Sequence, residues 1–380
     1  MVLLDRPVGS TRRQGQEDWI LALATVIAAG LGLIFIYTAT KSGLAVNGLD
    51  GKYFLKRQAI FDVLGVAIML VLWRVDYRRI EQIATPAYAA SILMLLAVLS
   101  PLGSNALGAQ RWFALGPLQI QPSEFTVLAV IMAFATYCNR RPDGLTLRDV
   151  SRLLLMVGFP MLLIIVQPDL GTVIIMLIVF LVMMAAAGLP GRLLLWLVIG
   201  VVLAVVIAIE GGFLSSYQIH RLTSFLNQNS SNPNLQQSIY NVKQAKDAIG
   251  SGGLFGTGLG QGAQTNLGYV PEQQTDFIFT AVGEQVGFLG SLLVVSLMGF
   301  IGFRILRGAF MTKDVLGRVV CAGIFAFFSF SVFQNAGMTM GIMPVTGIPF
   351  PFFSYGGSAA LVFFAGIGMV LSIEARRGGG

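Results

Sequence analysis

The chain contains a series of apolar stretches, each nearly long enough to cross a membrane, and these determine its fold class. A helix needs roughly 20 apolar residues to cross a bilayer, and the chain holds about ten such stretches. Of the 380 residues, 55% are hydrophobic and 11% are charged, whereas soluble domains carry about 25% charged residues. We therefore predict an all-α integral membrane protein, a single polytopic domain over 1–380, with one long outward loop at about 210–276. The expected spans are residues 18–40, 54–73, 86–101, 123–139, 152–166, 170–188, 191–209, 277–303, 317–341 and 357–374.

The distribution of Lys and Arg predicts the orientation of these spans. An even number of spans puts both termini on one side, and 17 of the 25 cations fall in the terminal segments and the loops of that side. We expect both termini in the cytoplasm and the long loop outside. The acids beside the basic loops, among them Asp18, Asp149 and Glu374, are then expected to be solvated. The few cations on the outer side suggest an anionic ligand there.

Composition also excludes several classes of function. His220 is the one histidine, which nearly excludes a Ser-His-Asp triad and rules out a His-rich metal site. Cys138 and Cys321 lie far apart in or near apolar runs, so no disulfide framework is readable. No nucleic-acid motif is present.

Asp276 stands where the long polar loop runs into the apolar residues Phe277-Ile278-Phe279. A carboxylate at the edge of a hydrophobic segment is costly to desolvate and so points to chemistry. Asp is also a favoured helix N-cap, and the local pattern leaves both interpretations open. Glu284 lies roughly 12 Å deeper along a helix, so we expect no direct dyad. A buried glutamate paired with a polar neighbour is as good an interpretation of it as a functional one.

Two polar motifs flank predicted spans. Arg111-Trp112 precedes Gln121-Pro122-Ser123-Glu124-Phe125. Pro122 fits the first turn of a helix, and the positive end of the helix dipole would stabilise the carboxylate of Glu124 there. Ordinary capping explains Ser123 as well, and Arg beside Trp is a common interfacial anchor. The run Gln167-Pro168-Asp169-Leu170-Gly171-Thr172 predicts a tight outward hairpin.

Two further segments are rich in Gly or Pro. Residues 250–262 contain seven glycines but lack the Gly-Lys-Ser/Thr ending of a nucleotide-binding loop. A loop that packs against the membrane region and a merely flexible loop remain equally open there. In residues 344–358, three prolines interrupt an apolar stretch, and we expect this segment to fold into the outer cavity.

Taken in order, the motifs resemble the SEDS family of peptidoglycan glycosyltransferases, which includes FtsW, RodA and SpoVE. The resemblance covers about residues 18–374, and the short N-terminal tail and the pair Thr275-Asp276 look more like the elongation branch, RodA, than the division branch, FtsW. The motifs that carry it are Arg57-Gln58, Gly108-Ala109-Gln110-Arg111-Trp112, Gln121-Pro122-Ser123-Glu124-Phe125, Gln167-Pro168-Asp169-Leu170-Gly171-Thr172, Pro271-Glu272-Gln273-Gln274-Thr275-Asp276, and Pro344-Val345-Thr346-Gly347-Ile348-Pro349 with Ser354-Tyr355-Gly356-Gly357-Ser358.

The resemblance implies a ten-helix enzyme of the bacterial cytoplasmic membrane that polymerises lipid II on the outer face during cell elongation. It also implies a class B penicillin-binding protein, a transpeptidase, as partner, and a divalent cation (Mg or Mn) at an unknown site. The family's essential acid maps onto Asp276. The remaining positions expected to bind substrate are Arg57, Gln58, Arg111, Trp112, Gln121, Ser123, Glu124, Asp169, Gln264 and Ser354.

Two positions depart from the family pattern. Val127 stands where the family usually has Lys, and Gly262-Ala263-Gln264 stands where elongation members often have Gly-Thr-Gln. The missing cation puts the usual polar network in doubt.

The expected chemistry is a single inverting displacement in which a sugar hydroxyl attacks an anomeric carbon and undecaprenyl diphosphate leaves. Such a reaction needs one general base, here Asp276, and cations on the leaving diphosphate, here Arg57 and Arg111. Two other functions remain open, a flippase for lipid-linked precursors and a non-catalytic scaffold of a cell-wall synthase. A transporter should show an internal repeat and polar groups near the membrane midplane, whereas the polar residues here crowd one end.

Overall fold

The computed structural model describes residues 18–106, 109–115, 118–141, 144–211 and 236–376, together with residues 219, 221, 225, 227 and 228. His220 and Gly108 lie outside the described residues. Ten long helices correspond to the ten predicted spans. They are α1 (Trp19–Val46), α2 (Tyr53–Arg74), α3 (Ile80–Leu99), α4 (Pro122–Asn139), α5 (Leu147–Val166), α6 (Leu170–Ala186), α7 (Gly191–Glu210), α11 (Ile278–Met311), α12 (Val315–Thr339) and α13 (Gly357–Arg376).

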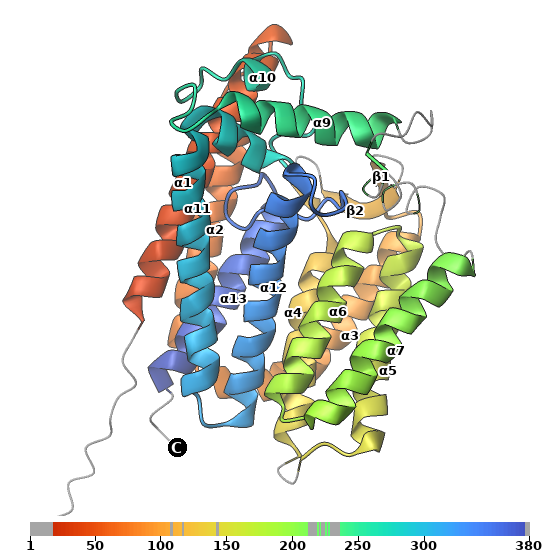
Figure 1. Ribbon diagram of the computed structural model, residues 1–380. Coiled ribbons are helices and arrows are strands. Elements are labelled where there is room, and N and C mark those ends of the chain that lie inside the picture. Colours follow the sequence, from red (N-terminus) through yellow and green to blue (C-terminus); the bar gives the residue numbers. More distant parts are fainter. Residues whose placement is uncertain are drawn as a thin grey trace, which may run out of the picture.

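These helices run side by side as one bundle, which confirms the predicted fold class of a multi-span helical membrane protein (Figure 1). By length and composition, six of the described segments could cross a membrane. They are Trp19–Val46, Tyr77–Leu99, Leu147–Val166, Ile278–Met311, Val315–Thr339 and Gly357–Arg376. The helix α9 (Gln236–Ser251) lies across one end of the bundle, near the short α10 (Ala263–Asn266). We call this end the loop end.

Helix boundaries differ from the prediction where local chemistry overrides the apolar pattern. The helix α3 begins at Ile80 and carries Pro86 in its interior, so the proline does not start it. Neighbouring helices tolerate such breaks in a membrane bundle. The helix α5 begins at Leu147 because Thr146 and Asp149 form a capping box. The helix α11 continues through the basic residues to Met311, and its backbone departs from helical geometry at Gly287, which has a φ of +65°.

A small antiparallel sheet was not predicted. It consists of β1 (Ser104–Ala106), β2 (Ala109–Leu115) and β3 (Leu118–Ile120) in the order β1-β2-β3, between α3 and α4. Two of its strands have only three residues, which is too short for an alternating pattern to be recognised. The sheet places Arg111 and Trp112 at the loop end.

The proline-rich segment 344–356 is packed into the protein, as expected. Its residues Phe350 and Phe353 are fully buried, and the Phe352 ring contacts Phe364 of α13 with centroids 4.9 Å apart. The helix α1 approaches this segment closely at Gly32, where a Cβ would lie 2.0 Å from the backbone oxygen of Phe352. The buried aromatic rings thus hold an irregular backbone between α1, α12 and α13.

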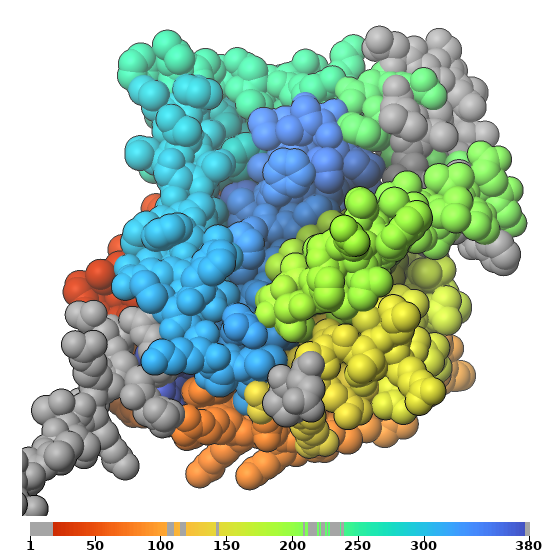
Figure 2. Space-filling model, turned by 60° about the horizontal axis from the view of Figure 1, so that its bottom comes forward, coloured from red at the N-terminus to blue at the C-terminus, as the bar shows by residue number. Residues whose placement is uncertain are grey.

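One expectation is wrong at the end of the bundle opposite the loop end. Figure 2, turned so that this end comes forward, shows the α2–α3 junction in orange, the start of α5 in yellow and the α11–α12 junction in blue. Asp18, Asp149 and Glu374 lie there, and each is almost fully buried rather than solvated. A bare buried carboxylate is unstable, so each requires partners.

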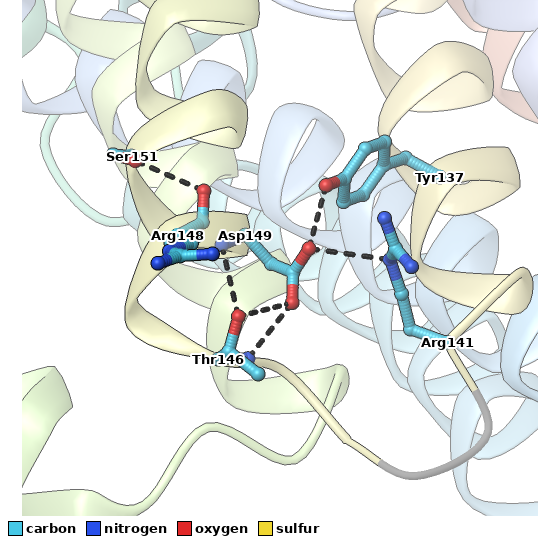
Figure 3. A network of polar contacts seen from close by, with 6 residues as sticks. All are labelled: Tyr137, Arg141, Thr146, Arg148, Asp149 and Ser151. Atoms are coloured by element: carbon cyan, nitrogen blue, oxygen red, sulfur yellow. Dashed lines mark hydrogen bonds and ion pairs between the residues drawn. The ribbon is translucent and has the colours of Figure 1, made fainter.

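Asp149 has its partners on α4 and on the turn before α5 (Figure 3). Its carboxylate accepts hydrogen bonds from the Tyr137 hydroxyl at 2.7 Å and the Thr146 hydroxyl at 2.6 Å, and it pairs with Arg141 at 3.2 Å. Asp18 caps α1 and forms an ion pair with Arg304 of α11. These acids join helices at this end of the bundle.

Candidate active site

Asp276 lies in a turn directly before α11 and does not cap that helix. The N-cap position is Phe277, and no side chain caps the helix start, so the capping interpretation of Asp276 is wrong. The backbone oxygen of Glu272 accepts the N–H groups of Thr275, Asp276 and Phe277 at 3.2, 3.1 and 3.3 Å. Glu272 itself has a φ of +48°, a conformation that is costly for a residue with a side chain. The Asp276 turn, residues 272–277, therefore depends on its neighbours for its shape.

The proline-rich segment holds one side of this turn. The Ser354 hydroxyl donates to the backbone oxygen of Thr275 at 2.5 Å, and the Tyr355 N–H donates to that of Gln274 at 2.7 Å. Ser354 Oγ also accepts the N–H of Phe350 at 2.8 Å. The hydroxyl of Ser354 is thus engaged with the backbone on both sides, and its contacts serve to position the turn.

Asn335 of α12 also fixes the Asp276 turn through hydrogen bonds. Its side-chain nitrogen donates to the backbone oxygen of Asp276 at 2.9 Å and to that of Ile348 at 2.8 Å. A buried Asn in an otherwise apolar helix is a recognisable signal of function in membrane proteins. The sequence analysis nevertheless missed this residue.

The Asp276 carboxylate faces Gly347 and Arg221. A Cβ placed on Gly347 would lie 3.3 Å from Asp276 Oδ2 and 3.8 Å from Arg221 Nη1. Gly347 also has a φ of +76°, which favours glycine. The sequence analysis missed both residues as parts of the site. Arg221 carried no signal beyond its charge, because its neighbours in the sequence form no motif.

The charges around Asp276 have opposing effects on its acidity. Loss of contact with water raises the pKa of Asp276 to about 6, and Glu272 and Asp169 act in the same direction. Arg221 and, to a lesser extent, Arg111 oppose this rise because they favour the carboxylate. These electrostatic interactions connect Asp276 with Arg221, Arg111 and Asp169.

Asp169 caps α6 and accepts hydrogen bonds from polar residues at the start of α4. Its carboxylate accepts hydrogen bonds from Gln121 Nε2 at 2.8 Å, Ser123 Oγ at 3.0 Å and Thr172 Oγ1 at 2.9 Å. Gln121, Ser123 and Asp169 are all buried. The start of α4 follows the prediction, since Pro122 occupies its first turn. This cluster fixes the start of α4 against the start of α6.

Glu124 lies one residue beyond this cluster and is less completely satisfied. Its Oε2 is buried without a hydrogen-bond partner. Val127, one turn further along α4, is 1% exposed and belongs to the apolar core. A Lys at 127 would lie three residues from Glu124, within reach for an ion pair. The departure at 127 therefore leaves Glu124 without a cation on its own helix.

Arg111 binds the end of α5. Its Nε donates to the backbone oxygen of Gln167 at 2.9 Å and one terminal nitrogen donates to that of Pro168 at 2.7 Å. The helix dipole also stabilises a positively charged guanidinium at the C-terminal end of a helix. Trp112 follows in β2, where its backbone oxygen accepts the hydroxyl of Ser104 at 3.1 Å. Arg111 is thus tied to the hairpin that carries Asp169.

Arg57 and Gln58 make contacts within α2 and with the proline-rich segment. Gln58 is fully buried, donates to Asp62 Oδ1 at 2.9 Å and accepts the N–H of Gly356 at 3.0 Å. Both ends of its amide are therefore used within the protein. The Arg57 guanidinium stacks over the Tyr53 ring at 4.4 Å. Gln264 lies in α10 with its side-chain oxygen buried and unpartnered.

The donor set bears on the divalent cation. Among the described residues, no group of three or more His, Cys, Asp or Glu side chains could hold a metal ion. Magnesium is commonly held by one or two carboxylates together with substrate phosphate oxygens. A divalent cation would therefore have to be completed by a bound diphosphate, and the unpartnered Oε2 of Glu124 is a carboxylate oxygen that could help to hold it.

Comparison with known proteins identifies the family. The model of the FtsW, RodA and SpoVE family, described as "Cell cycle protein", matches residues 18–378. The chain is 35% identical over 366 residues to the probable peptidoglycan glycosyltransferase FtsW of Trichlorobacter lovleyi, covering 96% of this chain and 94% of that protein. It is 38% identical over 351 residues to the peptidoglycan glycosyltransferase MrdB of Escherichia coli strain K12, covering 91% and 92%.

A solved structure agrees with these relatives. A chain described under "Structural coordination of polymerization and crosslinking by a peptidoglycan synthase complex" matches with a TM-score of 0.79 at 29% identity, over 95% of this chain and 98% of that chain. The helical bundle and these relatives thus define a multi-pass membrane enzyme of cell-wall synthesis. The chain belongs to the SEDS family of FtsW, RodA and SpoVE, and it is a peptidoglycan glycosyltransferase.

Proposed function

We propose that this protein polymerises lipid II into glycan strands during cell elongation, with Asp276 as the general base. The single observation that carries the proposal is the placement of Asp276 in a braced turn beside Arg221, with a pKa raised to about 6. A general base works best when its pKa lies near the working pH. At neutral pH such a group is mostly ionised and still basic enough to take a proton from a sugar hydroxyl.

The leaving diphosphate needs positive charge at its own oxygens, across the anomeric carbon from the attacking hydroxyl. Arg221 and Arg111 are the cations that act on Asp276, and we assign the diphosphate to them. Arg57, on the Tyr53 ring, would meet a more distant part of the lipid-linked substrate. The developing charge on the diphosphate oxygens is stabilised by such fixed cations. A bound magnesium or manganese ion would supply further positive charge to the same oxygens.

The loop end faces outward and both termini lie in the cytoplasm under this proposal. The excess of Lys and Arg in the terminal segments and alternate loops supports that orientation. A class B penicillin-binding protein is the proposed partner, which is supported by the similar chain that comes from a peptidoglycan synthase complex. The pair Thr275-Asp276 supports elongation, although relatives of the division and elongation branches are about equally similar.

Purified protein supplied with lipid II in detergent tests the reaction, with glycan products separated on a gel. The Asp276→Asn variant should make no polymer, while Asp247→Asn, the same change at an exposed acid of α9, should polymerise normally. Normal product from Asp276→Asn would refute its role as base. A wild-type protein that moves lipid II across vesicle membranes without joining it would favour the flippase.

The branch assignment has its own test. Expression in cells depleted of their elongation polymerase should restore rod shape, whereas expression in cells depleted of their division polymerase should not restore septa. Rescue of septation alone would overturn the assignment to elongation.

A further inference from the structure

Glu284 is a buried carboxylate that the proposed reaction does not use. It lies in α11, two turns below Asp276, and its side chain is 0% exposed. Its oxygens accept the N–H of Gln264 at 2.8 Å, the N–H of Thr265 at 2.9 Å and the hydroxyl of Thr265 at 2.6 Å. Three donors of this kind offset much of the cost of burying a carboxylate. The long loop is thereby fastened to α11 at α10.

The same threonine continues the connection toward the Asp276 turn. Thr265 Oγ1 accepts a hydrogen bond from Gln273 Nε2 at 3.0 Å, and that nitrogen also donates to Thr280 Oγ1 at 2.9 Å. The Thr280 hydroxyl in turn donates to the backbone oxygen of Phe277 at 2.6 Å. Gln273 and Phe277 lie on either side of Asp276 in sequence. This series of hydrogen bonds from Glu284 through Thr265, Gln273 and Thr280, which we call the polar chain, therefore contacts the Asp276 turn at both of its ends.

The turn needs such support because its backbone is strained. Glu272, directly before Gln273, has a φ of +48°. A residue with a side chain adopts this conformation at an energetic cost, and it persists only where the surrounding structure holds it in place. Ser354, Tyr355 and Asn335 hold the turn on one side. The polar chain is the corresponding support on the other side.

We infer that Glu284 is a positioning residue, which acts through Thr265 and Gln273 to hold the Asp276 carboxylate in place for glycan polymerisation. The inference rests on the proposed role of Asp276 as base. A carboxylate suits this position because it accepts at both oxygens, whereas an amide would turn an NH₂ group toward N–H donors. The backbone also leaves just enough room for the carboxyl group of Glu284, because a Cβ on Gly262 would lie 2.6 Å from Glu284 Cδ.

Thr265 offers a matched pair of variants. Thr265→Val keeps the shape but removes the hydroxyl that joins Glu284 to Gln273, and Thr265→Ser keeps the hydroxyl. We expect Thr265→Val to lower kcat about 10- to 100-fold with little change in KM, since misplacing a catalytic group by about 1 Å has an effect of this size. Thr265→Ser should stay close to wild type. Thr312→Val, which removes a buried hydroxyl near the opposite end of the bundle, is the control for general damage.

Two further measurements separate positioning from stability. The acidic limb of the pH–rate profile should shift in Thr265→Val, whereas a smaller folded fraction lowers the rate equally at every pH. Glu284→Gln combined with Thr265→Val should be no worse than the poorer single variant, because both break one connection. If Thr265→Val does not accumulate in membranes, Gln273→Met replaces it, since it breaks the same connection and leaves the three donors to Glu284.

Unchanged kcat and pH profile in Thr265→Val would overturn the inference, as would equal losses in Thr265→Val, Thr265→Ser and Thr312→Val. Failure of the proposed function is recognised separately, because the wild-type protein would then make no glycan. Amide hydrogen exchange in residues 272–277 tests the connection even in that case. It should be faster in Thr265→Val than in wild type, and equal exchange would count against the inference.

Discussion

The side-chain nitrogen of Asn335 lies 2.9 Å from the backbone oxygen of Asp276. The same nitrogen lies 2.8 Å from the backbone oxygen of Ile348, so one amide joins α12, the Asp276 turn and the proline-rich segment. These three parts of the chain are far apart in sequence. The position of the proposed base therefore depends on residues that local sequence does not connect.

Asn335→Asp should lower polymerisation strongly, because it replaces the donating nitrogen with an oxygen and removes both hydrogen bonds. Each buried carbonyl left without its donor costs about 1–3 kcal/mol, so the melting temperature in detergent should fall as well. Ser331→Ala is the control, since the Ser331 hydroxyl is buried one turn earlier in α12 and bonds only to its own helix at Phe327. Equal activity in the two variants would contradict the assigned role.

The rate of polymerisation should rise with pH and level off above a midpoint near 6. The raised pKa of Asp276 means that the acid is protonated, and inactive as a base, at lower pH. Arg221→Gln removes a charge that favours the carboxylate, so its midpoint should move to higher pH. Initial rates measured from pH 5 to 8 at lipid II concentrations well below KM show both effects, because kcat/KM reports the pKa of the free enzyme. A midpoint that does not move in Arg221→Gln would separate Arg221 from the base.

The same shift has a defined effect on stability. Because the folded-state pKa of Asp276 lies above its ordinary value, its stabilising contribution is complete in acid and is lost as pH rises through about 6. Asp276→Asn should therefore remove a pH-dependent decrease in melting temperature between about pH 4 and 6. A wild-type curve that instead gains stability across this window because of Asp276 would contradict the raised pKa.

Gly347→Ala should inactivate the protein more than its backbone strain alone explains. The added methyl group would lie 3.3 Å from Asp276 Oδ2 and would displace the carboxylate or Arg221. Gly188→Ala is a matched control, since Gly188 also has a positive φ, of +87°, but nothing lies within 4 Å of its Cβ position. Both variants should lose about 1–2 kcal/mol of stability from strain, and only Gly347→Ala should lose activity.

Gly252→Ala should loosen the long loop from α11. A Cβ at Gly252 would lie 2.1 Å from the backbone oxygen of Gly283, so the two segments would have to separate. Gly250→Ala adds the same methyl group where nothing lies within 4 Å, and it should be neutral or slightly stabilising within α9. Limited proteolysis of the loop measures the difference. Similar cleavage of both variants would argue against backbone contact at Gly252.

Arg304→Gln should destabilise the bundle by roughly 3–5 kcal/mol, the usual effect of leaving a buried charge without its partner. Burial alone would raise the pKa of Asp18, but hydrogen bonds with Arg304 and Glu374 hold it below its ordinary value. Lys56→Gln breaks the exposed pair with Asp50, in which the two side chains are 65% and 52% exposed, and it should leave the melting temperature nearly unchanged. Thermal unfolding in detergent compares the two variants.

The ten helices could be predicted because each contains a long apolar stretch, and this signal is local. The three-residue strands β1 and β3 carry no such signal. The helix α11 continues beyond residue 303 because a helix that leaves the membrane no longer needs apolar residues. Pro86 was misleading because the surrounding bundle compensates for the hydrogen bond that it removes.

The site could be predicted only in part. Asp276 stood out because a lone carboxylate beside an apolar helix is unusual, and Asp169 stood out for the same reason. The roles of Gln58 and Asn335 depend on contacts with Gly356, Asp276 and Ile348, which no local pattern reveals. The glycine-rich run could not be assigned from composition. Its glycines allow direct backbone contact with α11, as in the hydrogen bond from Phe288 N to Gly253 O at 2.9 Å.

The dependence of Glu284 on Gln264 and Thr265 has a consequence for how the protein is made. The ribosome produces residues 250–265 before α11, and under the proposed orientation these donors reach the far side of the membrane before their acceptor. A carboxylate that enters the bilayer without partners is costly. In that orientation the loop should lie across the membrane and near α11 when this helix inserts. The proposed topology thus implies an order of assembly, in which the loop receives the helix that follows it.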